Sequence, residues 1–421
     1  MKRSSAILLH ISSLASPGGI GTLGEAALRF VDFLSETGVK YWQMLPIGPL
    51  GPGNSPYQSV STRAGNTNFI DLEMLVEHGL LTDAQWKEID WGANPEAVDY
   101  ERVEAGRAIL LRRAFACAPQ SILADADAFT AAQSDWMTDY CLFMALKERY
   151  HGAPWWEWPK NLATRNPMAM QEARETLTEE MRFWAFGQFC FFWQFARLRA
   201  YAACQGVGFI GDLPIYVSAD SVDVWANASL FMLNEKGMPS HVAGVPPDGF
   251  SDEGQLWGNP LYNWEAMRAD GYRWWIDRMR GTLSLFDLVR IDHFRGFESY
   301  WAVAADAKTA QTGQWLQGPG MELFDALTSA LGPLPVIAED LGSLTDAVRA
   351  LLRETNFPGM KVLQFAFTPG IESDYLPHRL IPNSVVYTGT HDNNTLRGWF
   401  DTLDAETAAY CREYLSINAG E

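Results

Sequence analysis

Seven short apolar runs with the composition of β-strands recur along this chain of 421 residues, and helical patterns follow several of them. In the helical pattern of residues 25–36, one face carries Ala27, Phe30, Val31 and Leu34. Strand, helix and strand in alternation predict parallel βα units, because parallel strands need a crossover connection. The predicted strands are residues 6–14, 41–47, 208–217, 287–294, 335–341, 360–367 and 384–391.

Two long excursions interrupt this alternation. Residues of about 72–205 look wholly helical and lie between the second and third strands, and residues of about 218–285 form a loop-rich insertion before the fourth. We therefore expect an α/β fold, a (β/α)8 TIM-type barrel with large insertions between strands 2 and 3 and strands 3 and 4. Residues 1–421 would form one elaborated catalytic domain, with 72–205 as a helical subdomain. Seven strands are one short of closure, so we expect the sequence to end before strand 8.

Three of the predicted strands carry an acidic residue near their ends, namely Asp292, Glu339 and Asp392. Carboxylates are costly to bury, so a β-rich segment that ends in one usually presents it to a ligand. Strand ends of a parallel barrel converge on one face, which predicts a shared site. Clustered carboxylates without an evident set of metal ligands are typical of glycosyl transfer.

The segment Arg290-Ile291-Asp292 gives the first carboxylate a cationic neighbour. Residues two apart in a strand share a face, so Arg290 and Asp292 should point the same way. A guanidinium beside a carboxylate keeps it ionised and oriented, as a nucleophile requires. The alternative is a buried ion pair without a catalytic role.

The other two carboxylates have different surroundings. Glu339 follows apolar residues and precedes Asp340, a setting that raises the pKa of a carboxyl and suits a general acid, although a glutamate at a strand end is common. His391 and Asp392 could hydrogen-bond sugar hydroxyls and stabilise a positively charged transition state. A simple Asx-turn is the alternative for this third segment.

The overall charge narrows the choice of partners. The chain has 32 basic and 51 acidic residues, a formal net charge of -19, which argues against nucleic acid or an anionic membrane as a partner. A neutral carbohydrate would not be repelled. The 17 Trp, 14 Tyr and 23 Phe predict a large, well-packed core. The alternative is that some Trp and Tyr rings line a groove and stack on the apolar faces of sugars.

Other motifs are weaker. Gly19, Gly21 and Gly24 match a dinucleotide fingerprint, but no acidic residue ends the second strand, so a sharp loop is the better interpretation. Five scattered cysteines suggest neither a zinc site nor disulfides and indicate a cytoplasmic protein. The apolar segment at 6–9 is too short for a signal peptide, and the one at 183–195 is too short for a transmembrane helix. We therefore expect no membrane association.

Taken in order, the three acidic motifs resemble those of the 4-α-glucanotransferases known as amylomaltase or disproportionating enzyme, in the α-amylase superfamily. Further matches are Asn54-Ser-Pro-Tyr-Gln-Ser59, Gly211-Asp-Leu-Pro-Ile-Tyr-Val217 and Gln255-Leu-Trp-Gly-Asn-Pro260. They extend the resemblance from near the start of the chain to its end.

The resemblance implies a retaining transfer of α-1,4-glucan segments between maltooligosaccharides, without cofactor or metal. Asp292 would be the nucleophile, Glu339 the acid and base, and Asp392 the third carboxylate. An α-glucan hydrolase and a non-catalytic glucan-binding protein are the alternatives, and the sequence indicates no particular oligomeric state. The implied substrate-binding residues are Arg290 and His391 beside the cleaved bond, Tyr57 under the sugar ring, Asp212 on its hydroxyls, Asp248 in a lid over the acceptor side, Trp257, Ser55 and Asn259.

Overall fold

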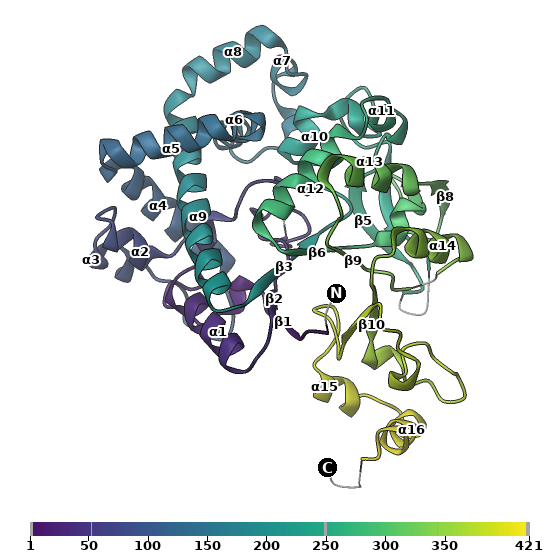
Figure 1. Ribbon diagram of the computed structural model, residues 1–421. Helices are drawn as coiled ribbons and strands as arrows, with labels where there is room; N and C mark the ends of the chain where they lie inside the picture. Colours follow the sequence, from purple (N-terminus) through teal and green to yellow (C-terminus); the bar gives the residue numbers. More distant parts are fainter. Residues whose placement is uncertain (1–2, 52, 248–250, 343, 418–421) are drawn as a thin grey trace.

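The parallel sheet of the computed structural model, which describes residues 3–51, 53–247, 251–342 and 344–417, contains all seven strands that the sequence predicts. Their order is β1-β2-β3-β6-β9-β10-β11, and the sheet curls into part of a barrel (Figure 1). The expected α/β fold of TIM-barrel type is confirmed. The strands are β1 (Ala6–Leu8), β2 (Tyr41–Gln43), β3 (Gly208–Leu213), β6 (Leu288–Ile291), β9 (Val336–Ala338), β10 (Gly359–Val362) and β11 (Ser384–Tyr387).

Alternation along the strands separates two packing layers. Ile210, Leu288, Ile337 and Met360 form one buried cluster inside the barrel. Their sequence neighbours Val289, Ile291, Val336 and Ala338 belong to the large core beneath the helices. Because side chains alternate with a period of two, the residues two positions further on, Asp212, Arg290 and Glu339, also face inward, at the carboxyl ends of the strands.

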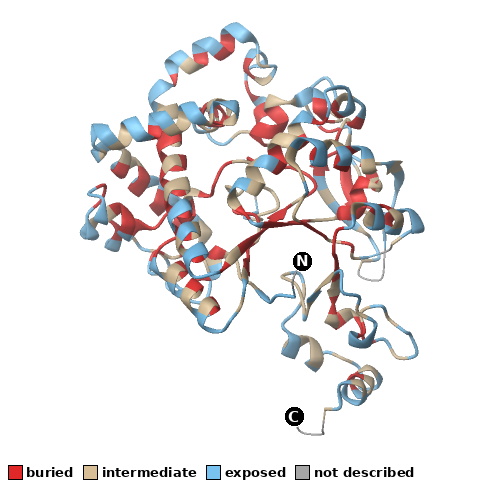
Figure 2. Ribbon diagram, viewed as in Figure 1, coloured by how far each residue is buried: buried red, intermediate tan, exposed pale blue. Residues whose placement is uncertain are grey.

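The chain between β2 and β3 is helical from residue 72 onward, as the sequence predicts. Among these helices, α4, α5, α6 and α8 pack against the long helix α9, whose buried residues extend from Phe183 to Ala202 (Figures 1 and 2). Whether they form a subdomain of their own remains a prediction. The helices are α2 (Leu72–Glu77), α3 (Asp83–Lys87), α4 (Tyr100–Cys117), α5 (Gln120–Ala132), α6 (Ser134–Arg149), α7 (Lys160–Ala163), α8 (Pro167–Thr176) and α9 (Thr178–Cys204).

Two buried glutamines attach α9 to the segment that leaves β2. Gln188 accepts from the Gly65 N–H at 2.8 Å and donates to the Gly65 carbonyl at 2.9 Å. Gln194 makes the same pair of bonds to Asp71, at 2.6 and 3.0 Å. Polar residues in an apolar helix thus satisfy buried backbone groups. Within the described residues, no helix is long and apolar enough to cross a membrane.

A second, antiparallel sheet with the order β5-β4-β7-β8 lies beside the barrel. The expectation that residues 218–285 form a loop-rich insertion is wrong for residues 241–245, because β4 occupies them and pairs with β7, about 60 residues away. The strands are β4 (His241–Val245), β5 (Gln255–Pro260), β7 (Ser299–Ala304) and β8 (Gly313–Gln317).

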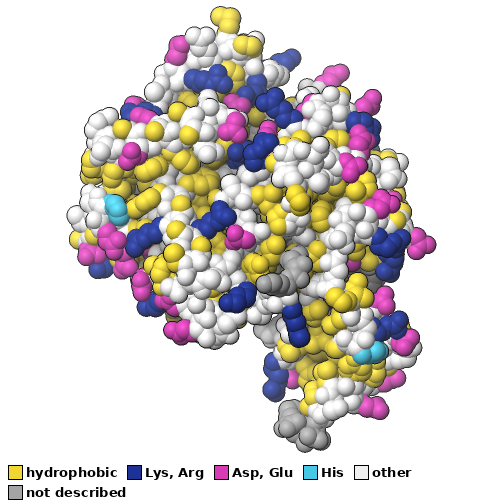
Figure 3. Space-filling model, viewed as in Figure 1, with side chains coloured by type: hydrophobic (Ala, Val, Ile, Leu, Met, Phe, Trp, Pro, Cys, Tyr) yellow, Lys and Arg dark blue, Asp and Glu magenta, His cyan; other side chains and the backbone are white. Residues whose placement is uncertain are grey.

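The remaining helices cover the barrel and extend to the C-terminal part of the chain. Hydrophobic side chains gather on the surface of the C-terminal part that carries α15 and α16 (Figure 3). Along this part of the chain, Ile381, Val386 and Leu396 are each at least 45% exposed. All five cysteines are free thiols. These helices are α1 (Glu25–Glu36), α10 (Val222–Ala226), α11 (Trp264–Ala269), α12 (Arg273–Leu285), α13 (Met321–Leu331), α14 (Asp346–Thr355), α15 (Leu396–Asp401) and α16 (Ala405–Leu415).

The glycine fingerprint near the start of the chain serves close packing. A Cβ on Gly21 would lie 1.8 Å from the carbonyl oxygen of Ile11, and one on Gly24 would lie 2.1 Å from the Asp71 carboxylate. Asp71 caps α2 and accepts from the Thr22 hydroxyl at 2.7 Å. The glycines therefore make a tight loop, as the sequence context predicts.

Candidate active site

Arg290 stands at the centre of the inward-facing polar residues. Its Nη1 lies 2.8 Å from both carboxylate oxygens of Asp212, which is directly opposite it on β3. Its Nη2 lies 3.0 Å from Oδ1 of Asp292. The guanidinium is 4% exposed, so its charge is compensated by two carboxylates rather than by water. Arg290 thereby fixes the position of Asp292, as its spacing in the sequence predicts.

The ionisation of Asp292 differs from the sequence expectation. Burial raises the pKa of Asp292 to about 7, against the attraction of Arg290, and the charges of Asp212, Glu339 and Asp392 add to the rise. The spacing in the sequence shows only the nearest cation, whereas the structure places three further carboxylates around the same group. Asp292 is therefore ionised only near and above neutral pH.

Glu339 is held by backbone donors at both carboxylate oxygens. The His293 N–H donates to Oε2 at 2.6 Å, and the Leu341 N–H donates to Oε1 at 3.0 Å. Burial raises the pKa of Glu339, while Arg290 and these two N–H groups oppose the rise. Burial behind the apolar residues that precede Glu339 is the main physical cause of the raised pKa.

Asp292 and Glu339 sit at the ends of neighbouring strands. Ile291 of β6 is paired with Ala338 of β9, and the Glu339 N–H donates to the Ile291 carbonyl at 3.0 Å. Adjacent strands lie about 4.8 Å apart, so the two carboxyl groups leave the sheet side by side.

Tyr57 and His391 form the opposite wall of the site. The Tyr57 hydroxyl donates to Asp212 at 2.6 Å and lies 2.9 Å from His391 Nε2, with the two rings stacked at 12° and 5.5 Å between centroids. Because the Tyr57 proton goes to Asp212, its oxygen accepts from His391, which assigns the ring proton to Nε2. Burial lowers the pKa of His391, so its ring is neutral.

Asp392 lies at the solvent side of this wall. Its Oδ1 is 3.3 Å from His391 Nε2, and its side chain is 74% exposed. Asp392 is the most open of the three predicted carboxylates, and its charge contributes to the raised pKa of Asp292.

Several predicted substrate-binding residues form hydrogen bonds or ion pairs with other residues of the protein. Asp212 has a side chain only 1% exposed and is occupied by Arg290 and Tyr57, so we assign it to positioning these two residues rather than to sugar contact. Asn259 is buried and bonds to the Val217 carbonyl at 2.8 Å and to Gln58 at 3.1 Å. Ser55 accepts from the Tyr57 N–H at 3.3 Å, which shapes the turn before Tyr57.

Trp257 contacts the site indirectly, because its ring packs against His293. The Trp257 ring packs edge-on against the His293 ring at 4.8 Å and contacts Tyr216 at 6.2 Å. Asp248, in the expected lid, lies outside the described residues.

His293 is a site residue that the sequence analysis did not select. Its backbone is left-handed, with φ of 51°, and this conformation aims its N–H at Glu339. Burial and Arg295 lower the pKa of His293 to about 3, so its ring is neutral. The signal in the sequence was its place between Asp292 and Phe294, but nothing local reveals a left-handed histidine.

Among the described residues, no group of three or more His, Cys, Asp or Glu side chains is arranged to hold a metal ion.

Comparisons with known proteins give one consistent family. Residues 9–420 match the model of glycoside hydrolase family 77, described as 4-alpha-glucanotransferase. The 4-alpha-glucanotransferase of Streptococcus pneumoniae is 47% identical over 98% of this chain and 82% of its own, and that of Thermus thermophilus is 46% identical over 99% and 83%. The structure of amylomaltase from Streptococcus agalactiae in complex with acarbose superposes with a TM-score of 0.97, at 41% identity, over 100% of this chain and 86% of that one.

Proposed function

The chain belongs to the 4-alpha-glucanotransferase family, and from this membership we propose that Asp292, Glu339 and Asp392 carry out the transfer by a retaining double displacement. The protein is an enzyme of the amylomaltase type. Its substrates would be α-1,4-glucans, among them the maltooligosaccharides of starch and glycogen metabolism. The Streptococcus agalactiae relative was solved in complex with acarbose, which supports glucan binding by this family.

Asp292 is the proposed nucleophile. The observation that carries this assignment is the position of Arg290, which holds Asp212 at 2.8 Å and Asp292 at 3.0 Å. A carboxylate that is oriented by a buried guanidinium, with one face open, can attack an anomeric carbon without moving first. The attack would form a covalent glucosyl-enzyme and release the shortened glucan.

Glu339 is the proposed acid and base. In the first step it gives its proton to the leaving glycosidic oxygen, which its raised pKa allows. It then takes the proton from the 4-hydroxyl of the acceptor glucan, which attacks the glucosyl-enzyme. The two backbone N–H donors on Glu339 stabilise the carboxylate that exists between these steps.

Asp392 and the wall of Tyr57 and His391 would bind the sugar that reacts. The exposed Asp392 can accept from sugar hydroxyls and place a negative charge near the positively charged transition state. We propose that Tyr57 offers its ring to the sugar and that Trp257 and the segment of residues 242–251 help to exclude water. Exclusion matters because water, at about 55 M, competes with every glucan acceptor.

Maltotriose incubation tests the assignment. We expect the wild type to convert maltotriose into a ladder of shorter and longer oligomers, and Asp292→Ala to lose this activity. A folded Asp292→Ala variant that still disproportionates maltotriose would contradict the nucleophile. Steady accumulation of reducing ends, without longer products, would favour the hydrolase alternative.

A further inference from the structure

Two polar side chains inside the barrel, Gln43 and Tyr387, have no role in the mechanism proposed above. The Tyr387 hydroxyl donates to Oε1 of Gln43 at 2.9 Å, although the two residues are 344 positions apart in the sequence. Gln43 is the last residue of β2, and Tyr387 is the last residue of β11. A satisfied polar pair in an otherwise apolar interior specifies one arrangement of the strands that carry it.

The pair lies in the layer beneath the catalytic residues. Gln43 is paired with Ile210 of β3, and Tyr387 packs against the inner apolar cluster to which Ile210 belongs. Asp212 follows Ile210 by two positions, so it faces inward one layer higher, where it is paired with Arg290. The bond between Gln43 and Tyr387 therefore lies below the ion pair that orients the proposed nucleophile.

This hydrogen bond joins two strands that do not pair with each other. Among the described residues, β2 pairs with β1 and β3, whereas β11 pairs with β10. The two strands lie near opposite ends of the strand order, so the bond crosses the interior of the barrel. It fixes a separation that the backbone ladders of the sheet leave to side chains.

The strand β11 leads into the third carboxylate of the site. His391 and Asp392 follow Tyr387 by four and five residues. On the other face of β11, Val386 is 50% exposed, so packing on that side contributes little to the position of the strand. The place of Asp392 in the site therefore depends on contacts made across the barrel.

The pair makes such a contact without adding a charge. Burial raises the pKa of Tyr387 to about 12, although the charge of Arg290 opposes the rise, so the phenol keeps its proton and donates it. Gln43 is 1% exposed and accepts this bond as a neutral amide. The balance of charge among Arg290, Asp212 and Asp292 is thus left undisturbed.

We propose that Gln43 and Tyr387 are positioning residues of the transfer reaction. Their hydrogen bond holds the end of β11, and with it Asp392, in place relative to Asp292. The inference rests on the roles proposed above for these two carboxylates. A displacement of about 1 Å in a group that acts on the transition state can cost on the order of 100-fold in rate, so the bond should affect kcat more than KM.

Removal of one hydroxyl tests this role. We expect Tyr387→Phe to lower kcat for maltotriose disproportionation by roughly tenfold and to leave KM within about twofold of the wild type. Tyr140→Phe is the matched control, because the buried Tyr140 hydroxyl also bonds a buried glutamine, Gln188, at 3.1 Å in the helical insertion. The control should keep its kcat. A folded Tyr387→Phe variant with the kcat of the control would overturn the proposal.

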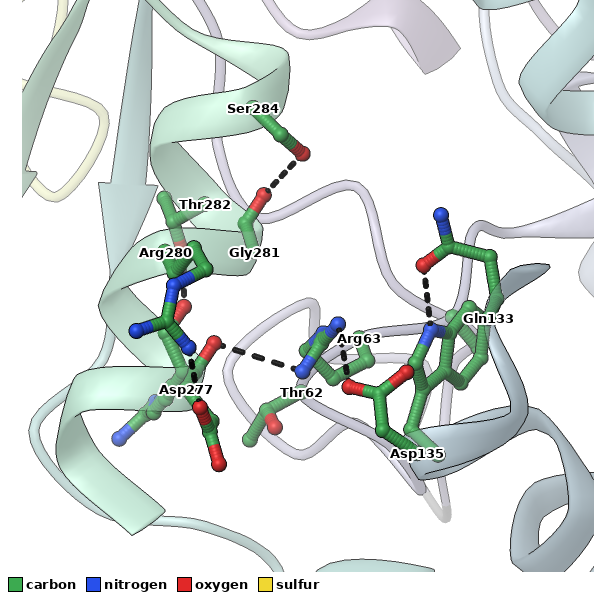
Figure 4. Close-up of polar contacts among 12 residues, drawn as sticks. Thr62, Arg63, Gln133, Asp135, Asp277, Arg280, Gly281, Thr282 and Ser284 are labelled. Carbon is green, nitrogen blue, oxygen red and sulfur yellow. Dashed lines mark hydrogen bonds and ion pairs between the residues drawn. The ribbon is translucent and has the colours of Figure 1, made fainter. Parts of the chain in front are cut away.

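A double-mutant cycle tests whether the bond itself is responsible. Gln43→Met removes the acceptor at a similar side-chain length, and the double variant with Tyr387→Phe should have the kcat of either single variant. Gln133→Met is the control, because Oε1 of Gln133 accepts from the Trp136 indole N–H at 3.1 Å in the helical insertion (Figure 4). Losses that multiply in the double variant would show that Gln43 and Tyr387 act separately, and would overturn the proposal.

Hydrogen exchange gives a readout that does not depend on activity. In the full chain, Tyr387→Phe should speed the exchange of amides in residues 388–393, relative to the wild type and to Tyr140→Phe, while residues 208–213 keep their rates. Unchanged exchange in residues 388–393 would overturn the link between the two strands, whatever the activity of the variant. Absence of transfer by the wild type would contradict the proposed function and leave this measurement unaffected.

Discussion

Arg290 binds both carboxylate oxygens of Asp212 through a single nitrogen, at 2.8 Å each, and so leaves its second nitrogen free to hold Asp292 at 3.0 Å. Asp212 therefore has a positioning role in the site. It determines the direction of the guanidinium, and the guanidinium determines the direction of the proposed nucleophile.

Arg290→Lys should be damaging although it preserves the charge. A lysine ammonium is a single point and cannot hold two carboxylates in the geometry of the guanidinium fork. We expect kcat to fall by roughly 100-fold and the free energy of unfolding to fall by about 3 kcal/mol, because a buried carboxylate loses its partner. Arg397→Lys is the control, since Arg397 is 87% exposed and should tolerate the change. Equal activity of both variants would show that the fork is unnecessary.

The acid limb of the pH profile should lie near neutrality. Catalysis needs ionised Asp292, whose pKa is raised to about 7, so kcat/KM should rise with pH through about 7. The limb reports the coupled titration of the carboxyl cluster rather than one isolated group. Asp392→Asn removes a charge that raises this pKa, so its acid limb should move to lower pH. An acid limb near pH 4 in the wild type would mean that the attraction of Arg290 outweighs burial.

The Tyr57→Phe variant tests the contribution of the hydroxyl separately from that of the ring. The hydroxyl bonds Asp212 and His391, whereas the ring alone stacks on His391. Losing a hydrogen bond to a charged group costs about 1.5–3 kcal/mol, so kcat/KM should fall by roughly 10- to 100-fold, mainly through kcat. Tyr57→Ala should raise KM as well, because the ring is lost. The control is Tyr414→Phe, whose hydroxyl contacts His378 far from the carboxylates.

We expect His293 to influence catalysis through its backbone N–H, which donates to Glu339. A β-branched residue resists the left-handed conformation, so His293→Val should lower the free energy of unfolding by about 1–3 kcal/mol, while His293→Asn tolerates it. If the Val variant withdraws the N–H from Glu339, the ionised carboxyl loses a stabilising bond and its pKa rises further. The alkaline limb of kcat/KM should then move to higher pH in the Val variant only. An alkaline limb that stays in place or moves to lower pH in His293→Val would argue against stabilisation of ionised Glu339 by the His293 N–H.

Much of the barrel was predictable from local pattern. Each strand is a short apolar run whose composition and period are contained in a few consecutive residues, and all seven pair in the expected parallel sheet. The same period of two places Arg290 and Asp292 on one face, and the structure has them 3.0 Å apart. The small antiparallel sheet was missed, because β4 becomes a strand only by pairing with β7.

The amino-acid sequence by itself determined which segments form the seven strands of the parallel sheet, which of these strands lead into carboxylates and which arginine accompanies Asp292, since these depend on neighbours along the chain. Only the tertiary structure decided that Asp212 is enclosed by Arg290 and Tyr57, that His293 turns its N–H to Glu339, and that the pKa of Asp292 is raised. The physical reason is the same in each case. Burial and charge at a point in space are sums over groups that are far apart in the sequence and become neighbours only when the barrel forms.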